Sequence, residues 1–353
     1  MAMIVDIVAP GTPGFPPERI DTGLGGNEAT LVAWWRALHA RGVRARVFLG
    51  GDADSSAWQT DDWRTADSWD AIRRADPPDA VLSWRDANLL QRTPASAVRV
   101  LYIGDRVTPG LDQPVECELV FVGSKAAYQR YHRQISPRHG FVVHSYGHTV
   151  DTDLPAGIER RRWQCVHSSA PYRGLGPLLE LWPRIRHQAP QATLSVMGGY
   201  RLWGYDAQQA RHLTLREVPR LEDPPDGVHY LGEVNRADYL RTLAESQIML
   251  YPTNYEEMGC ITALEAAACG TVPVVSDRAA LRERVTDGHS GLLIPGDVTD
   301  PRVRDMFADQ AAALLHDPLR LEELGARSRR AAACHTVDHV IDTLLERITA
   351  CAR

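Results

Sequence analysis

Two glutamates eight positions apart, Glu257 and Glu265, form the most informative chemical pattern in this 353-residue chain. The segment that holds them, Tyr251–Val275, predicts a strand end, an acidic loop, a short helix closed by Gly270 and a second strand. Each carboxylate can accept hydrogen bonds from two neighbouring hydroxyls. The amides of Met258–Cys260 at the expected helix start favour an anion. The pattern therefore indicates a site for a polyhydroxylated ligand that carries phosphate, and the alternative is an ordinary amphipathic helix with a solvated glutamate.

A pair of glycines near the N-terminus has similar properties. Gly25 and Gly26 stand before Asn27 and Glu28, at the start of a long expected helix. A backbone without side chains can come close to an anion, and a helix start attracts one. The alternative is a plain tight turn.

The length of 353 residues suggests two domains of ordinary size, and the composition limits the classes of partner. The hydrophobic fraction of 44%, the charged fraction of 24% and the net charge of −6 are typical of soluble globular proteins and argue against nucleic acid or an anionic membrane as partner. The six cysteines show no C-x-x-C spacing, which argues against a structural metal site and favours reduced thiols. The N-terminal segment does not have the pattern of a signal peptide, and no apolar run approaches the roughly 18 residues of a membrane span. We expect a cytoplasmic protein.

Short apolar runs alternate with helical segments, which predicts two doubly wound parallel sheets. The expected strands are Met3–Val8, Ala45–Leu49, Ala80–Trp84, Val98–Ile103, Leu119–Gly123, Phe141–His144, Gln164–His167, Thr193–Met197, Val228–Tyr230, Ile248–Tyr251 and Val272–Val275. The expected helices include Glu28–Arg41, Leu175–Gln188, Arg236–Ser246, the short helix at Glu265 and Val337–Arg347. The polar stretch 146–162 is the expected linker. This gives an N-terminal domain over residues 1–155, a C-terminal domain over 156–335, and a last segment, 336–353, that returns toward the first domain. Ligands of such sheets bind at the carboxyl ends of the strands.

Four segments in order resemble the GT-B glycosyltransferases, and in particular the retaining family 4. They are Gly25–Glu28 (GGNE), His167–Leu181 (HSSAPYRGLGPLLEL), Glu257–Glu265 (EMGCITALE) and Gly288–Asp297 (GHSGLLIPGD). The resemblance extends over nearly the whole chain and is strongest from about residue 160 to 300. It implies two Rossmann-like domains that face a cleft.

The resemblance also implies roles for individual residues. Arg173, whose planar guanidinium suits a diphosphate, would be a catalytic group together with Glu257 and Asp105. Glu265 would bind the ribose hydroxyls and Glu257 the donor sugar. The other expected donor-binding residues are Gly25, Gly26, Ser168, Ser169, Met258, Gly259, Cys260 and Ile261. Ser168 and Ser169 could equally be caps or turns.

The implied activity is transfer of a sugar from a nucleoside-diphosphate sugar to a hydroxyl of a small-molecule or saccharide acceptor. The anomeric configuration would be retained, with neither metal nor cofactor and with the protein as a monomer or homodimer. Alternatives are a nucleotide-sugar epimerase, a phosphorylase or a cyclitol-coupling enzyme of the same fold, and an inert subunit that binds a nucleotide sugar and activates a partner. A nicotinamide dehydrogenase is disfavoured because the segment at Gly25 lacks G-x-G-x-x-G.

Three departures from the family pattern concern the phosphate loop and the acceptor side. Ser168 stands where a second basic residue is common. Gly104 stands where a histidine is usual before Asp105, a residue that could orient the acceptor or simply cap a turn. The segment Ser145–Asp151 is longer than the usual turn, and His144 or His148 could act as a base there or be plain linker histidines.

The acceptor is suggested only by an acidic loop with tryptophans between Gly50 and Asp79. Indole rings stack on sugars, and carboxylates attract cations or hydroxyls. One hypothesis is therefore a cationic or sugar-like acceptor, and the alternative is that the tryptophans anchor the loop to the domain. The residues concerned are Trp58, Trp63, Trp69, Asp52, Asp54, Asp61, Asp62, Asp67 and Asp70.

Overall fold

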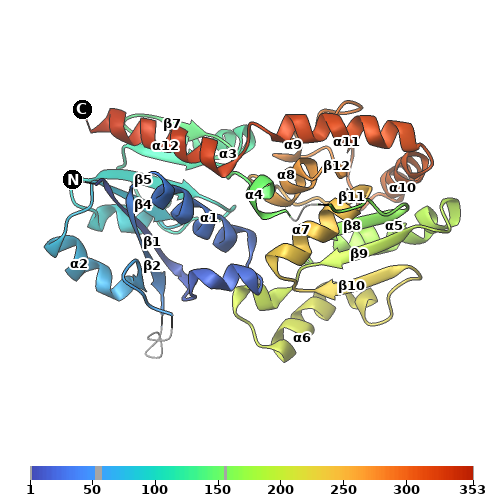
Figure 1. Cartoon of the computed structure of the whole chain (residues 1–353), viewed down its shortest axis with the longest axis horizontal. Coiled ribbons are helices and arrows are strands. Elements are labelled where there is room, and N and C mark those ends of the chain that lie inside the picture. Colours follow the sequence, from blue (N-terminus) through green and yellow to red (C-terminus); the bar gives the residue numbers. More distant parts are fainter. Residues whose placement is uncertain (1, 52–57, 155–156, 353) are drawn as a thin grey trace. The chain divides into compact units, whose positions relative to one another are not determined.

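The computed structural model of the chain describes residues 2–51, 58–154 and 157–352 and divides into two compact units (Figure 1). Unit 1 comprises the described residues of 1–19, 26–147 and 337–353, and unit 2 comprises 20–25 together with those of 148–336. The division falls at 147/148 and 336/337, beside the boundaries predicted at 155/156 and 335/336. Residues 148–154, predicted to be part of the first domain, thus belong to unit 2.

Unit 1 is built on a parallel sheet of seven strands in the order β3-β2-β1-β4-β5-β6-β7. The strands are β1 (Ile4–Pro13), β2 (Arg44–Gly50), β3 (Trp63–Thr65), β4 (Ala80–Trp84), β5 (Val98–Ile103), β6 (Leu119–Val122) and β7 (Phe141–Val143). The helices are α1 (Gly26–Ala40), α2 (Trp69–Ala75), α3 (Lys125–Tyr131) and α12 (Val337–Cys351). The order of strands changes direction at β1 and β4, so the loops after these strands lie at the usual ligand-binding edge of such a sheet.

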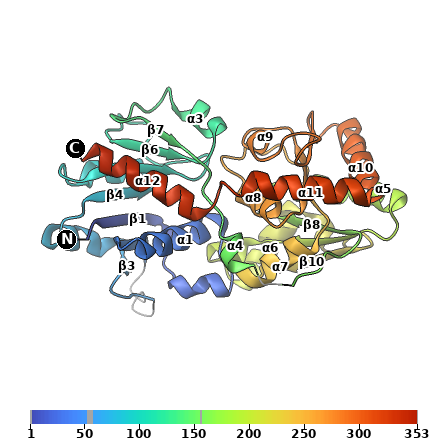
Figure 2. The ribbon, with the colours of Figure 1, turned by 45° about the horizontal axis from the view of Figure 1, so that its top comes forward.

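The last helix of the chain packs in unit 1 beside the first. Figures 1 and 2 show α12 (red) along α1 (blue), and Arg41 after α1 donates to Asp338 and Asp342 of α12. The apolar residues of α12 at helical spacing, among them Val340, Ile341 and Leu344, are fully buried.

Unit 2 holds a parallel sheet of six strands in the order β10-β9-β8-β11-β12-β13. The strands are β8 (Gln164–Ser168), β9 (Thr193–Met197), β10 (Val228–Gly232), β11 (Ile248–Tyr251), β12 (Val272–Ser276) and β13 (Leu292–Ile294). The helices are α4 (Val150–Asp153), α5 (Leu175–Gln188), α6 (Ala207–Glu217), α7 (Arg236–Glu245), α8 (Ile261–Ala268), α9 (Leu281–Arg284), α10 (Pro301–Leu315) and α11 (Pro318–Ala332).

Hydrophobic side chains cover both faces of this second sheet. Cys165 of β8 belongs to one core cluster and Val166, its neighbour, to another. Because successive side chains of a strand point to opposite faces, the sheet is buried on both sides, as the continuous apolar runs predicted. The two-domain α/β fold predicted from the sequence is confirmed. The strands β3 and β13 and the helices α2, α3, α4, α6, α9, α10 and α11 were not among the predicted elements.

Candidate functional site

The first glutamate of the pair lies where strand β11 ends. Tyr251, the last residue of β11, places its hydroxyl 2.6 Å from Oε1 of Glu257 and 2.9 Å from Oγ of Ser169. Glu257 is 3% exposed, and burial raises the pKa of the Tyr251 hydroxyl well above its usual value. Tyr251 therefore stays protonated and donates to the buried carboxylate.

Arg173 approaches the same carboxylate from the loop before α5. Its Nη1 lies 3.5 Å from Oε2 of Glu257, and its guanidinium stacks over Tyr255 at 4.3 Å and Tyr172 at 5.4 Å. Burial alone would lower the pKa of Arg173, but Glu257 and the surrounding tyrosines raise it well above its usual value. The arginine is therefore a permanent positive charge, held by an anion and two aromatic rings.

The two serines of the phosphate loop lie at the carboxyl end of β8. Ser168 closes the strand and is buried, whereas Ser169 is half-buried and touches Tyr251. The loop after β9 comes so close that a Cβ on Gly198 would stand 2.2 Å from the Ser169 carbonyl oxygen. Since Gly198 also has a φ of 123°, only glycine fits at this approach.

The helix that carries the second glutamate begins later than the sequence indicated. Its first residue is Ile261, preceded by Cys260 in the left-handed conformation with a φ of 49°. The amides of Met258 and Gly259, expected at the helix start, belong to the loop before it, and Arg284 donates to the Gly259 carbonyl over 2.8 Å. The positive end of the helix dipole thus lies at Ile261 and the residues that follow it.

The second glutamate, Glu265, is held by two residues of α7. Tyr239 donates its hydroxyl to Oε2 over 2.7 Å, and Nη1 of Arg236 lies 2.6 Å from Oε1. Arg236 also contacts Asp153 at 3.2 Å and Thr149 at 2.9 Å. Neither Arg236 nor Tyr239 was predicted as a site residue. Their spacing of three on a helix places them on one face, but nothing in the sequence pairs that face with α8.

The remaining predicted residues, apart from Gly25, lie in unit 1. Asp105 follows β5, and its Oδ1 accepts a hydrogen bond from the backbone amide of Arg106 over 2.7 Å. Gly25 belongs to unit 2, whereas Gly26 is the first residue of α1 in unit 1. Glu28 is 8% exposed; burial raises its pKa, while Arg85, whose Nη2 lies 3.6 Å from Oε1, acts in the opposite direction.

Gly104 leaves no space for the histidine that is usual in the family. A Cβ at this position would stand 2.4 Å from Oδ1 of Asn27 and 2.6 Å from Cε1 of Tyr102. Tyr102 is fully buried, so its ring cannot move aside easily. The absence of the histidine is therefore built into the packing of unit 1.

His148 is a packing residue, in keeping with the plainer of its two interpretations. It is 3% exposed, its Nε2 lies 3.0 Å from the Ala332 carbonyl oxygen, and its Nδ1 accepts from the Val150 amide. Both ring nitrogens are thus engaged within unit 2. His144 is half-buried, with its ring 5.4 Å from that of His339.

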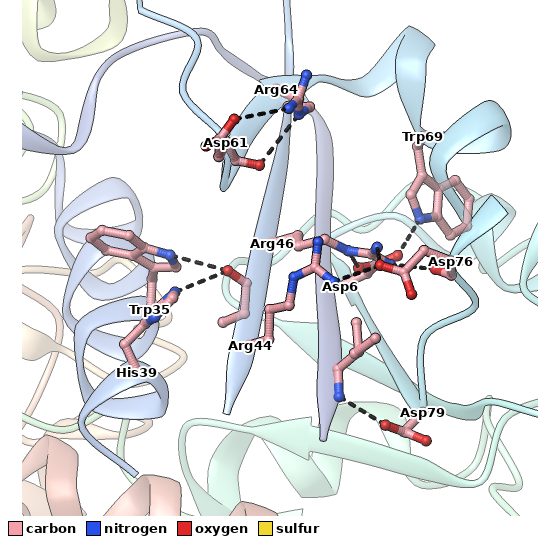
Figure 3. A network of polar contacts seen from close by, with 12 residues as sticks. Asp6, Trp35, His39, Arg44, Arg46, Asp61, Arg64, Trp69, Asp76 and Asp79 are labelled. Atoms are coloured by element: carbon pink, nitrogen blue, oxygen red, sulfur yellow. Dashed lines mark hydrogen bonds and ion pairs between the residues drawn. The ribbon is translucent and has the colours of Figure 1, made fainter. Parts of the chain in front are cut away.

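The hypothesis that tryptophans of the acidic loop stack on an acceptor is wrong for two of the three. Trp63 and Trp69 are fully buried, and Trp69 donates to Asp6 over 2.9 Å, in the network that Figure 3 shows. These rings anchor the segment to unit 1 instead. Trp58 is half-buried and packs against Gly14. Asp52 and Asp54 lie outside the described residues.

Unit 2 therefore brings together most of the predicted donor site. Arg173, Glu257 and Ser169 meet around Tyr251, and Glu265 is fixed on the helix that follows. Between residues 2 and 352, leaving out 52–57 and 155–156, no three His, Cys, Asp or Glu side chains gather in a way that could hold a metal ion. No helix within these same residues is long and apolar enough to cross a membrane.

Known proteins resemble the chain in both sequence and structure. The D-inositol 3-phosphate glycosyltransferase of Kribbella flavida is 32% identical over 158 residues, which is 43% of this chain and 33% of that protein. The alpha-maltose-1-phosphate synthase of Mycolicibacterium smegmatis is 30% identical over 161 residues, 45% of this chain and 40% of that protein. The chain thus spans well under half the length of these relatives.

The fold is shared along the whole chain. The crystal structure of Anabaena HepE in complex with UDP and glucose has a TM-score of 0.73 over 99% of this chain and 100% of that chain, at 16% sequence identity. Residues 157–331 match the family model described as glycosyl transferases group 1. The chain thus contains a domain that matches the group 1 glycosyl transferases, and its fold is that of the GT-B glycosyltransferases.

Proposed function

We propose that the protein is a retaining, metal-independent glycosyltransferase that transfers a sugar from a nucleoside-diphosphate sugar to a hydroxyl of a small-molecule or saccharide acceptor. The observation that carries the proposal is the pairing of Arg173 with Glu257 at the carboxyl end of the second sheet. This pair combines a fixed cation with a buried acceptor of hydrogen bonds. A ligand with phosphate beside hydroxyls needs both.

Arg173 supplies the charge that the leaving group requires. When the bond between sugar and diphosphate breaks, negative charge builds up on the diphosphate, and a fixed guanidinium stabilises it. Tyr172 and Tyr255 flank the guanidinium and orient it before the ligand binds. Arg173 therefore loses little conformational entropy when it binds the diphosphate. One preorganised donor of this kind contributes about 3–4 kcal/mol to transition-state stabilisation. This contribution supports the proposal that the reaction proceeds without a metal ion.

Glu257 and Glu265 provide two separate grips for hydroxyl groups. Glu257 lies next to Arg173 and so suits the sugar that is attached to the diphosphate, while Glu265 suits the ribose. Ser168 ends β8 and Ser169 follows it beside Tyr251, where their hydroxyls can donate to phosphate. Retention follows from the resemblance to family 4. On the acceptor side, Asp105 stands at the carboxyl end of β5, the edge where parallel sheets bind ligands.

A direct assay tests the proposal. The purified chain is incubated with UDP-, GDP-, ADP- and TDP-sugars and a panel of hydroxylated acceptors, in the presence of EDTA. We expect release of nucleoside diphosphate that depends on the acceptor, and an NMR spectrum in which the product keeps the anomeric configuration of the donor. Inversion of the anomeric carbon or full inhibition by EDTA would contradict the corresponding part of the proposal. Epimerised donor without an acceptor, or binding without turnover, would instead identify an epimerase or an inert partner subunit.

A further inference from the structure

Both oxygens of the Glu265 carboxylate already hold a fixed partner within unit 2. Oε2 accepts from Tyr239 over 2.7 Å, and Oε1 lies 2.6 Å from Nη1 of Arg236. Each carboxylate oxygen has two lone-pair directions. One direction on each oxygen is therefore engaged by the protein and one is left for a ligand, so that Glu265 is suited to two adjacent hydroxyls.

The two partners of Glu265 are themselves held in place. Arg236 donates to Thr149 over 2.9 Å and lies 3.2 Å from Asp153, so its guanidinium is fixed from three sides. Tyr239 is half-buried, and its hydroxyl also lies 3.2 Å from Oγ1 of Thr262, one turn before Glu265 on the same helix. The carboxylate cannot rotate without breaking one of these contacts.

The electrostatics of this cluster favour the protonated, donating forms of the two partners of Glu265. Burial alone would lower the pKa of the Arg236 guanidinium, but Glu265, Tyr239 and Asp153 raise it above its usual value. Burial and the negative charge of Glu265 raise the pKa of the Tyr239 hydroxyl. Around neutral pH the cation and the phenol are thus both donors.

We propose that Arg236 and Tyr239 are positioning residues that hold Glu265 for a cis-diol, and that through it they select ribonucleotide over 2′-deoxyribonucleotide donors. This inference rests on the proposed function, in which Glu265 binds the ribose. A carboxylate in one fixed orientation recovers two hydrogen bonds from a diol without a loss of side-chain entropy. Removal of the 2′-hydroxyl leaves one of these acceptors unpaired, which costs affinity.

The test is isothermal titration of the full chain with UDP, GDP and ADP, each compared with its 2′-deoxy form. For the unaltered protein and its preferred base, we expect the affinity for the ribonucleotide to be at least about tenfold higher than that for its 2′-deoxy form. In Tyr239→Phe the affinity for the ribonucleotide should fall about tenfold, and that for the deoxynucleotide by less than threefold. Arg236→Lys keeps the charge but loses the planar donor set and should show the same loss of preference in weaker form.

Matched controls separate positioning from simple loss of stability. Tyr146→Phe removes a buried hydroxyl that donates to the Ile103 carbonyl in unit 1, and Arg184→Lys alters an ion pair with Asp309 on the surface of unit 2. Both should leave the preference for ribose unchanged. An equal loss for both nucleotides in Tyr239→Phe, or an unchanged ratio in both Tyr239→Phe and Arg236→Lys, overturns the inference. Failure of the unaltered protein to bind any of the nucleotides would instead contradict the proposed function.

Discussion

The hydroxyl of Tyr251 lies 2.6 Å from Oε1 of Glu257, so that the last residue of a buried strand fixes the first glutamate of the pair. The second glutamate has a similar arrangement, with the Tyr239 hydroxyl 2.7 Å from Oε2 of Glu265. In each case an arginine contacts the other carboxylate oxygen. The two glutamates are thus held alike, although their partners come from unrelated segments of the chain.

Replacement of Tyr251 with Phe should lower kcat/KM. The change removes one donor to a buried carboxylate while keeping the ring that packs beside His167. A hydrogen bond to a charged group contributes about 1.5–3 kcal/mol, which corresponds to a loss of roughly tenfold to a hundredfold. Steady-state kinetics with the preferred donor measures this loss of kcat/KM, and Tyr146→Phe is the control. Unaltered kinetics in Tyr251→Phe would show that the orientation of Glu257 does not limit the reaction.

Replacement of Arg173 with Lys should reduce turnover about a hundredfold or more, because an ammonium group cannot donate in a planar fork to the diphosphate. The stacking over Tyr255 and Tyr172 is also lost. Single-turnover rates at saturating donor isolate this chemical effect. Arg184→Lys, in an exposed ion pair of the same unit, should behave like the unaltered protein. Equal rates in Arg173→Lys would contradict the role of Arg173 at the leaving group.

Replacement of Gly104 with Ala should destabilise unit 1 by about 1–3 kcal/mol, the usual cost of overpacking. The added methyl group would stand 2.4 Å from Asn27 and 2.6 Å from the buried ring of Tyr102. Gly11→Ala in β1 is the control, since its methyl group would meet no atom within 4 Å. Thermal unfolding of the three proteins compares them. Equal melting temperatures for Gly104→Ala and the unaltered protein would show that Asn27 and Tyr102 make room for a side chain at position 104.

Local sequence signals predicted much of this fold. The bounds of α5 (Leu175–Gln188) and of strands such as β4 and β11 agree with the prediction, because apolar runs and the glycine before α5 are local features. The three-residue strand β3 is too short for any periodicity to appear. Helices α10 and α11 are amphipathic, but none of the motifs recognised in the sequence lies within them.

The candidate site was only partly predictable, for a different reason. Arg173, Glu257 and Glu265 stand in motifs that can be recognised along the sequence, whereas Arg236 and Tyr239 reach Glu265 only because α7 packs against α8. Such nonlocal pairing leaves no trace in a single sequence. The hypothesis that Trp63 and Trp69 stack on an acceptor was wrong because the composition of a loop does not show whether an aromatic ring is buried.

The stability of unit 2 should depend on pH through His167. Burial lowers the pKa of this fully buried imidazole from 6.5 to about 4. The folded state therefore favours the neutral ring. The contribution of neutral His167 to the free energy of unfolding is complete above pH 6.5 and is lost as the pH falls toward 4. A shift of this size corresponds to about 3 kcal/mol. Thermal unfolding between pH 4 and 7.5 should show that the unaltered protein loses more stability on acidification than His167→Gln. Parallel curves for the two proteins would contradict the prediction.

The buried ion pair of unit 1 offers the largest expected effect on stability. Nε of Arg46 lies 2.6 Å from Oδ1 of Asp6, and both side chains are buried in the network of Figure 3. Arg46→Ala should cost about 3–5 kcal/mol, because it leaves the Asp6 carboxylate buried without its cation. Arg44 contacts the same Asp76 that Arg46 reaches, but its side chain is half exposed to solvent. Arg44→Ala should therefore cost less than about 1 kcal/mol. Chemical denaturation of both variants measures the difference, and equal losses would show that burial does not distinguish the two arginines.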